Sequence, residues 1–269
     1  MVIGCPLAQT QSPCLHDYIY QYLGLNAVLL AFSHSSILPL INAIKALHVG
    51  LTAVTLPFKQ VVMKYLTSCD IVAQKVGAIN TIIQHDERLY GYNTDINGIE
   101  YALKNIMLKD KNVLIMGAGG AARAAGYVMQ EHGANIFWLN RTRKRAVKLS
   151  NDFSGTVINH QQLKNIPVDL IINTTPLGMY PNEKESPLPN YSFKPSHIVF
   201  DMVYHPMDTQ LLLAAKKANA KTIPGIQMFI GQGIRQVELW TRKHINLNHA
   251  ALSRLNKLLI QQQLSLKKV

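Results

Sequence analysis

The sequence lacks the features that mark several classes of protein. Its 269 residues contain no apolar run of the ~18–20 residues that a membrane-spanning helix needs, and MVIGCPL at its start has no basic region ahead of an apolar stretch. The three cysteines form no CxxC pair, which argues against a disulfide framework or a zinc site and favours a reducing compartment. The ten histidines show no HExxH or comparable ligand spacing. We therefore expect a soluble, cytoplasmic protein that holds no metal and has no membrane partner.

Acidic residues are scarce, because 15 Asp and Glu stand against 27 Lys and Arg and give a net charge of +12. A basic surface can bind nucleic acid, or it can gather a small anionic substrate and cofactor. Much of the charge is dispersed, as on ordinary solvated surfaces, and no helix-turn-helix, zinc-finger or RNP-type pattern accompanies it. We expect no nucleic-acid partner.

Short apolar runs alternate with helical patterns along the chain, which is typical of an α/β protein with mostly parallel sheets. After the polar break LKDKN the pattern restarts as strand, Gly-rich turn, helix and strand, and the chain from about residue 228 is helical in pattern. Before the break we expect strands over 2–6, 26–32 and 52–56, helices over 14–23, 37–47 and from Pro57, a hairpin over 78–94 and a helix over 96–107.

The segment GAGGAAR places Gly117, Gly119 and Ala122 in a G-x-G-x-x-G/A frame between a buried strand and a helix. Gly117 permits the tight turn, Gly119 lets the backbone approach a pyrophosphate, and Ala122 allows close packing of helix on strand. The helix N-terminus offers free N–H groups and a positive dipole end to phosphate. Because the whole βαβ unit is present, the segment predicts dinucleotide binding.

The end of the next strand indicates which dinucleotide binds. An NAD site usually has Asp or Glu there, whereas this chain has NRTRKR over residues 140–145. Guanidinium groups bind a 2′-phosphate through paired, charge-assisted hydrogen bonds, so NADP(H) is favoured. The loops NTTPLGMYP and DMVYHP also follow buried strands and are candidate walls of the cofactor site.

The stretch VTLPFK places a lone lysine where an apolar strand turns. Pro57 suits the first position of a helix, so Lys59 is expected in the first helical turn, where the dipole disfavours an ammonium group. Asp95 opens another helical pattern and is most simply an N-cap. Two strand-to-helix junctions of one sheet converge on one rim, so Lys59 and Asp95 are candidates for a pair that manages a substrate proton.

These segments together resemble the shikimate dehydrogenase family over nearly the whole chain. The matching segments, in order, are IGCPLAQTQSP, VTLPFK, GAINT, GYNTDING, GAGGAAR, NRTRKRA, NTTPLGM, DMVYHP and GIQMFIGQ. The resemblance implies an N-terminal α/β substrate domain over 1–95, completed by C-terminal helices over 228–269, and a Rossmann-type domain over 96–227. It also implies NADP-dependent, reversible reduction of 3-dehydroshikimate to shikimate, without a metal.

The resemblance implies roles for individual residues. Lys59 matches the family's catalytic lysine and Asp95 its partner, and both contact substrate. The other matches to substrate-binding positions are Thr10 and Ser12, for the carboxylate, and Thr55, Asn80, Tyr204 and Gln232. The matches to cofactor-binding positions are Gly117, Ala118, Gly119, Gly120 and Ala121 at the pyrophosphate, Asn140, Arg141, Thr142 and Arg145 at the 2′-phosphate, and Met202 and Gly225 at the nicotinamide.

One departure from the family's pattern bears on substrate choice. Where the family usually reads His-Ser-x-Ser-Pro, this chain reads QTQSP, and Thr10 adds a methyl group beside its hydroxyl. A quinate/shikimate enzyme, with NADP or NAD, is therefore an alternative. A non-catalytic nucleotide or metabolite sensor is an alternative of another class, against which the presence of both Lys59 and Asp95 counts. A homodimer is possible.

Overall fold

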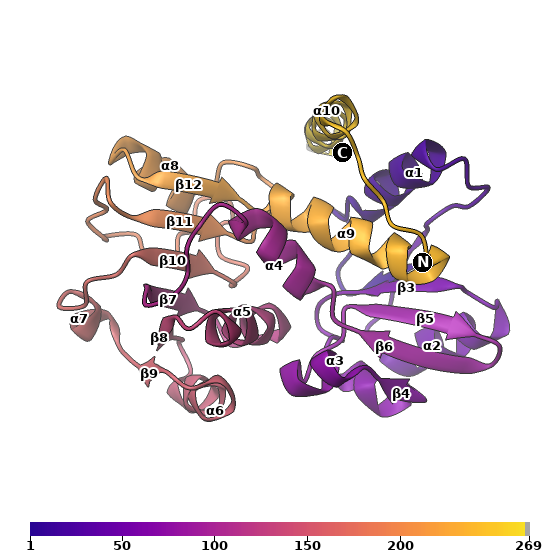
Figure 1. Ribbon diagram of the computed structural model, residues 1–269, viewed down its shortest axis with the longest axis horizontal. Coiled ribbons are helices and arrows are strands. Elements are labelled where there is room, and N and C mark those ends of the chain that lie inside the picture. Colours follow the sequence, from indigo (N-terminus) through magenta and orange to yellow (C-terminus); the bar gives the residue numbers. More distant parts are fainter. Residues whose placement is uncertain (267–269) are drawn as a thin grey trace. The chain divides into compact units, whose positions relative to one another are not determined.

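The computed structural model describes residues 1–266, with side chains in the last helix up to residue 263. The chain divides into two compact units (Figure 1). One consists of Met1–Asp95 and the chain from Ile230 onward, and the other of Ile96–Phe229. The sequence placed these divisions at residues 95 and 228.

The first unit contains a mixed six-stranded sheet in the order β2-β1-β3-β5-β6-β4. β5 pairs antiparallel with β3 and with β6, and the other pairings are parallel. The hairpin of β5 and β6 is as predicted, since its turn leaves His85 paired with Arg88. The strands are β1 (Val2–Gly4), β2 (Ala31–Ser33), β3 (Leu51–Val54), β4 (Ser68–Cys69), β5 (Thr81–His85) and β6 (Arg88–Tyr92).

The directions of three neighbouring strands position the candidate site. Because β5 runs antiparallel to both β3 and β6, those two strands run the same way. Their carboxyl ends therefore meet the amino end of β5 at one edge of the sheet. The chain continues from β3 to Lys59 and from β6 to Asp95, and Asn80 directly precedes β5. Three polar residues far apart in sequence thus reach the same edge.

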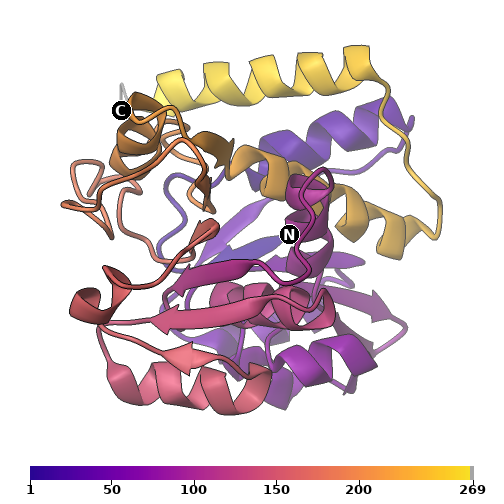
Figure 2. The same cartoon turned by 60° about the vertical axis from the view of Figure 1, so that its left-hand side comes forward.

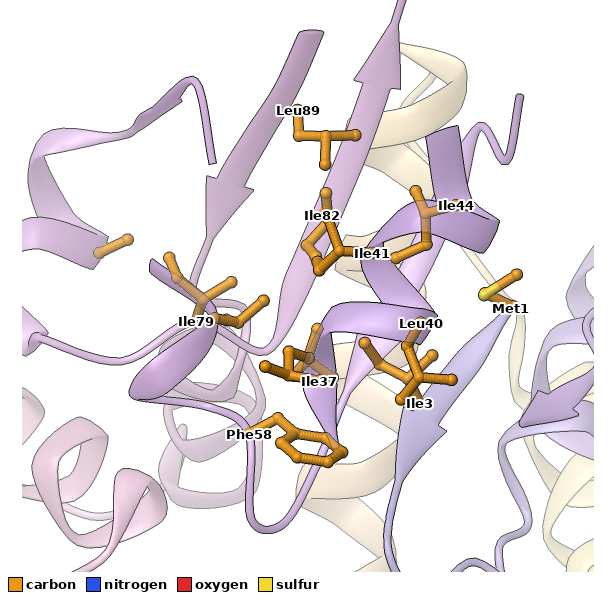
Figure 3. Packing of buried hydrophobic residues seen from close by; sticks show 13 residues of the cluster. Met1, Ile3, Ile37, Leu40, Ile41, Ile44, Phe58, Ile79, Ile82 and Leu89 are labelled. Carbon is orange, nitrogen blue, oxygen red and sulfur yellow. The ribbon is translucent and has the colours of Figure 1, made fainter. Parts of the chain in front are cut away.

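One face of α2 packs into the core of the first unit. Its buried residues recur at the spacing of a helix face, while Leu38 between them stays half exposed. Figure 3 shows these side chains gathered against Ile3 and Ile82 from the strands. The buried residues of that face are Ile37, Leu40, Ile41 and Ile44. The helices before residue 95 are α1 (Ser12–Tyr22), α2 (Ile37–Ala46), the 3₁₀ helix η1 (Val61–Tyr65) and α3 (Ile71–Val76).

The structure corrects two expectations for this unit and adds one strand. No α-helix begins at Pro57, because the carbonyl of Lys59 accepts from the backbone N–H of Ile79 at 2.6 Å, and only η1 follows. The strand expected over 26–32 is reduced to β2 at the sheet edge, and the short strand β4 was not predicted.

The second unit contains a six-stranded parallel sheet in the order β9-β8-β7-β10-β11-β12. Numbered within the unit this is 3-2-1-4-5-6, the order of a doubly wound dinucleotide-binding fold. Its strands are β7 (Asn112–Met116), β8 (Asn135–Leu139), β9 (Thr156–Val157), β10 (Leu170–Asn173), β11 (Ile198–Asp201) and β12 (Lys221–Pro224). Its helices are α4 (Asp95–Leu103), α5 (Gly120–Glu131), α6 (Arg143–Phe153), α7 (His160–Leu163) and α8 (Gln210–Lys217). The α/β class predicted from the alternating pattern is confirmed.

Two helices end the chain, α9 (Ile226–Thr241) and α10 (His249–Leu266). Figure 2 shows α10 running beside α1. Gln11, fully buried before α1, donates its Nε2 to the carbonyl of Leu259 at 2.7 Å and accepts from Gln263. The C-terminal helix thus packs on the start of the chain. No helix among residues 1–266 is both long and apolar enough to span a bilayer.

Candidate active site

Lys59 and Asp95 form an ion pair at the edge of the first sheet. Lys59 Nζ donates to Asp95 Oδ2 at 2.5 Å, and the two side chains are 16% and 5% exposed. The expectation that Lys59 lies in the first turn of a helix is wrong, since Lys59 lies in a turn before η1. The pair therefore holds a proton in a position to be donated.

The buried side chain of Asn80 fixes the Asp95 carboxylate from the other side. Asn80 Nδ2 donates to Asp95 Oδ1 at 2.9 Å and to Thr94 Oγ1 at 2.9 Å. Its Oδ1 accepts from the backbone N–H of Thr94 at 2.6 Å and from the hydroxyl of Thr81 at 2.9 Å. Both ends of the carboxamide are therefore in use, so Asn80 is oriented and holds Asp95 in place.

The two hydroxyls predicted to bind a carboxylate are neighbours. Thr10 Oγ1 donates to Ser12 Oγ at 3.3 Å, just where α1 begins. Thr55 follows β3 and packs against the end of β1, because a Cβ built on Gly4 would lie 2.5 Å from its methyl carbon. These hydroxyls come from chain segments at the carboxyl ends of two adjacent parallel strands.

The remaining predicted substrate residues lie in different units. Gln232, on α9, accepts from Asn80 Nδ2 at 3.4 Å and so joins the set in the first unit. Tyr204 belongs to the second unit, where its ring stacks on Phe229 with centroids 4.4 Å apart.

The glycine turn lies after β7, where the strand order reverses. Gly117 has φ +112°, and a Cβ there would come within 2.4 Å of Thr174 Oγ1, so a side chain does not fit. A Cβ on Gly119 would have no heavy atom within 4 Å, which leaves open space over the start of α5. Gly120 and Ala121 form the first turn of α5, and Ala118 precedes them. The first turn of α5 has backbone N–H groups without partners inside the helix, which can donate to an anion.

The basic loop after β8 leads into the first turn of α6. Arg141, Thr142 and Arg145 are exposed, and Asn140 Nδ2 donates to the carbonyl of Thr142 at 2.9 Å. The first turn of α6 contains no acidic residue. Cations at a helix N-terminus are unfavourable alone, and a phosphate dianion bound among them relieves this repulsion.

The two predicted nicotinamide-side positions are in contact. A Cβ on Gly225 would lie 2.6 Å from the backbone oxygen of Met202, so only glycine permits this approach. The residues follow β12 and β11, which are paired neighbours in the parallel sheet.

Behind these loops lies a buried polar network that sequence reasoning missed. Asp201, at the end of β11, accepts from Asn173 Nδ2 at 2.9 Å, from the N–H of Val203 at 3.0 Å and from Thr209 Oγ1 at 2.6 Å. Asn173 Oδ1 in turn accepts from the N–H and the hydroxyl of Thr175. The network shapes both loops that follow β10 and β11. The sequence does carry one signal for this network, because the buried strands β10 and β11 each end in a polar residue.

Comparisons with known proteins agree with this geometry. The family description "Shikimate dehydrogenase substrate binding domain" matches residues 2–82, and "Shikimate / quinate 5-dehydrogenase" matches residues 100–176. The NADP(+) shikimate dehydrogenase of Methanocaldococcus jannaschii is 38% identical over 268 residues, which cover 91% of this chain and 92% of that one. This chain belongs to the shikimate dehydrogenase family.

Two further members of the family are similar along most of their length. The NADP(+) shikimate dehydrogenase of Aquifex aeolicus is 36% identical over 244 residues, which cover 89% of each chain. The crystal structure of the shikimate 5-dehydrogenase of Thermus thermophilus, in complex with NADP(H) and shikimate, aligns with a TM-score of 0.86 at 30% identity. That alignment covers 97% of this chain and 98% of the other.

Asp201 gives stability a defined pH dependence. Burial raises its pKa to about 6, against 3.8 for a free carboxyl, and its three hydrogen-bond donors offset only part of this. Between these values the folded protein holds a proton that the unfolded chain has lost, so this contribution favours folding at low pH and is lost as pH rises through 6. At 1.36 kcal/mol per pKa unit the change is on the order of 3 kcal/mol.

We expect Asp201→Asn to remove the part of the pH dependence of stability that Asp201 causes. Asn keeps an acceptor that faces Asn173 and can donate to Thr209, so the fold should be retained. The measurement is urea unfolding of the original protein and of the variant between pH 4 and pH 7. The free energy of unfolding of the variant, relative to the original protein, should rise across the interval. A difference that stays constant over the interval contradicts the pKa assigned to Asp201.

Proposed function

We propose that this protein catalyses the reversible NADPH-dependent reduction of 3-dehydroshikimate to shikimate, a step toward chorismate and the aromatic amino acids. The observation that carries the proposal is the Lys59–Asp95 ion pair at the sheet edge of a chain in this family. A sensor without catalysis does not need a proton-transfer pair, so the pair favours an enzyme.

The residues of the first unit have separate roles toward the substrate. The Lys59 ammonium donates a proton to the carbonyl oxygen as the ketone becomes an alcohol, and in the reverse direction the neutral amine takes that proton back. Asp95 holds Lys59 and accepts from a substrate hydroxyl, while Thr10 and Ser12 donate to the carboxylate. Directed hydrogen bonds of this kind discriminate strongly among polyhydroxy acids.

The second unit has a donor set that fits NADP(H). When bound, the cofactor supplies the hydride that adds to the carbonyl carbon. The open space over Gly119 and the N–H groups of α5 suit a pyrophosphate, and the exposed cations of the 140–145 loop suit a 2′-phosphate. Met202 and Gly225 line the part of the cofactor site that would hold the nicotinamide.

We expect Lys59→Ala to keep the fold and cofactor binding and to lower kcat by about 10²–10⁴-fold, the usual contribution of a general acid–base group. The measurement is absorbance at the nicotinamide band with NADP⁺ and either shikimate or quinate, which also determines the preferred acid. Lys64→Ala, an exposed lysine in η1, is the matched control. Turnover near that of the control would remove Lys59 from the mechanism.

The basic loop is expected to select the phosphorylated cofactor. Arg141→Ala should raise the KM for NADPH by about 10–100-fold, the worth of a charge-assisted hydrogen bond, and leave the KM for NADH nearly unchanged. Lys148→Ala serves as the control, because it removes an exposed charge from α6, the helix that follows the loop. An equal rise in the KM for NADPH and for NADH would show that the loop does not bind the 2′-phosphate.

A homodimer through the edge strand β2 is part of the proposal. Residues 18–44 contain no Lys, Arg, Asp or Glu, although the chain has a net charge of +12. Val28 and Leu30 beside this strand are 64% and 53% exposed, and Phe32 within it is 38% exposed. β2 is an edge strand without the charges that usually prevent edge pairing. Two copies related by a two-fold axis can pair there without bringing like charges together.

Val28→Lys is expected to convert such a dimer to monomers at micromolar concentration, measured as mass by light scattering. Ile71→Lys places the same charge at an apolar position on α3 that is 72% exposed and should leave the mass unchanged. A monomeric original protein at high concentration would refute the dimer.

A further inference from the structure

Two buried polar atoms of the first unit, one on α1 and one on α9, have no hydrogen-bond partner among the described residues. One is His16 Nε2, in a side chain of α1 that is fully buried. His16 Nδ1 lies 2.8 Å from the carbonyl oxygen of Ser12, and since a carbonyl only accepts, Nδ1 carries the proton. Burial lowers the pKa of His16 to about 4, so at neutral pH Nε2 is an acceptor.

The other atom is Oε1 of Gln236, which is 1% exposed on α9. The other end of this carboxamide is in use, because Nε2 donates to the carbonyl of Asn80 at 3.1 Å and to Thr81 Oγ1 at 3.0 Å. His16 lies against the same stretch of α9, since a Cβ on Gly233 would be 3.8 Å from its Cε1. A hydrogen bond from protonated His16 to the Gln236 side chain raises the pKa of His16, but burial outweighs this contribution and lowers it.

The carboxamide of Gln236 has one alternative orientation. Turned by 180°, its NH₂ would satisfy His16 Nε2, but its oxygen would then face the carbonyl oxygen of Asn80. The Thr81 hydroxyl, which now donates to Asn80 Oδ1, would be drawn to the turned oxygen. The orientation present leaves two acceptors unpaired, which costs free energy, and retains every bond that holds Asn80.

We propose that Gln236 is a positioning residue for the reaction, acting through Asn80 on the Asp95 carboxylate. Its NH₂ group fixes the backbone of Asn80 and the hydroxyl of Thr81. Asn80 Nδ2 then holds Asp95 Oδ1, so that Oδ2 meets Lys59. His16 competes for the same NH₂ group and makes the arrangement sensitive to substitution at either end. The inference rests on the proposed function, because it concerns the efficiency of the same proton transfer.

The test is Gln236→Leu, which keeps the volume and removes both hydrogen bonds. We expect kcat to fall about tenfold, the loss that corresponds to one misplaced hydrogen bond in the transition state, with the KM for NADP⁺ unchanged within twofold. In an Asn80→Ala background, Gln236→Leu should lower kcat by less than twofold, because the residue through which it acts is gone. A merely structural residue would lower kcat by the same factor in both backgrounds.

Val237→Ala is the matched control, since Val237 is fully buried on the same helix and its truncation destabilises the protein without touching the polar network. The inference is overturned if Gln236→Leu lowers kcat no more than Val237→Ala at a similar loss of Tm, or if the effects of Gln236→Leu and Asn80→Ala multiply. Absence of dehydrogenase activity in the original protein would instead refute the proposed function, so the two failures are distinguishable.

Discussion

The candidate site depends on the relative direction of three strands. β3 and β6 run the same way only because β5 lies between them and runs the other way. Reversing one of these pairings would put Lys59 and Asp95 at opposite ends of the sheet. The ion pair at 2.5 Å is therefore a consequence of topology, and its partial burial makes the pairing with Asp95 and the support from Asn80 necessary.

Much of this could be predicted from the sequence, because the signals were local. The glycine frame, the basic loop and the hairpin turn are each contained in a few neighbouring residues, and a parallel sheet collects strand ends at one edge. The helix at Pro57 was wrong because the carbonyl of Lys59 bonds to Ile79, a contact twenty positions away that local preference does not contain. Gln236 was missed for the same reason, although it lies one helical turn after Gln232 on the same helix.

The two units present different kinds of hydrogen-bond donor at their proposed anion sites. The first offers side-chain hydroxyls at Thr10 and Ser12, which are neutral donors that can be placed precisely. The second offers backbone N–H groups at α5 and exposed cations at the start of α6. A small rigid acid must be oriented to within a fraction of an ångström before it can react. The phosphates of a dinucleotide only need to be bound tightly and, at the 2′ position, to be distinguished from a hydroxyl. The polar donors of the proposed substrate set are buried or half-buried, and several are hydrogen-bonded to one another, whereas the cations of the 140–145 loop are exposed.

The same device supports both sets of loops, an Asn at a strand end whose NH₂ group holds a neighbouring Asp. Asn80 holds Asp95 in the first unit, and Asn173 holds Asp201 in the second, each at 2.9 Å. The difference lies in the third partner. Asp95 meets the ammonium of Lys59, so its charge is balanced, whereas Asp201 meets the hydroxyl of Thr209, and burial raises its pKa to about 6. In the proposed function, one Asn–Asp pair supports proton transfer and the other only supports the shape of its loops. The residue that separates these two roles is Lys59, the lysine of VTLPFK.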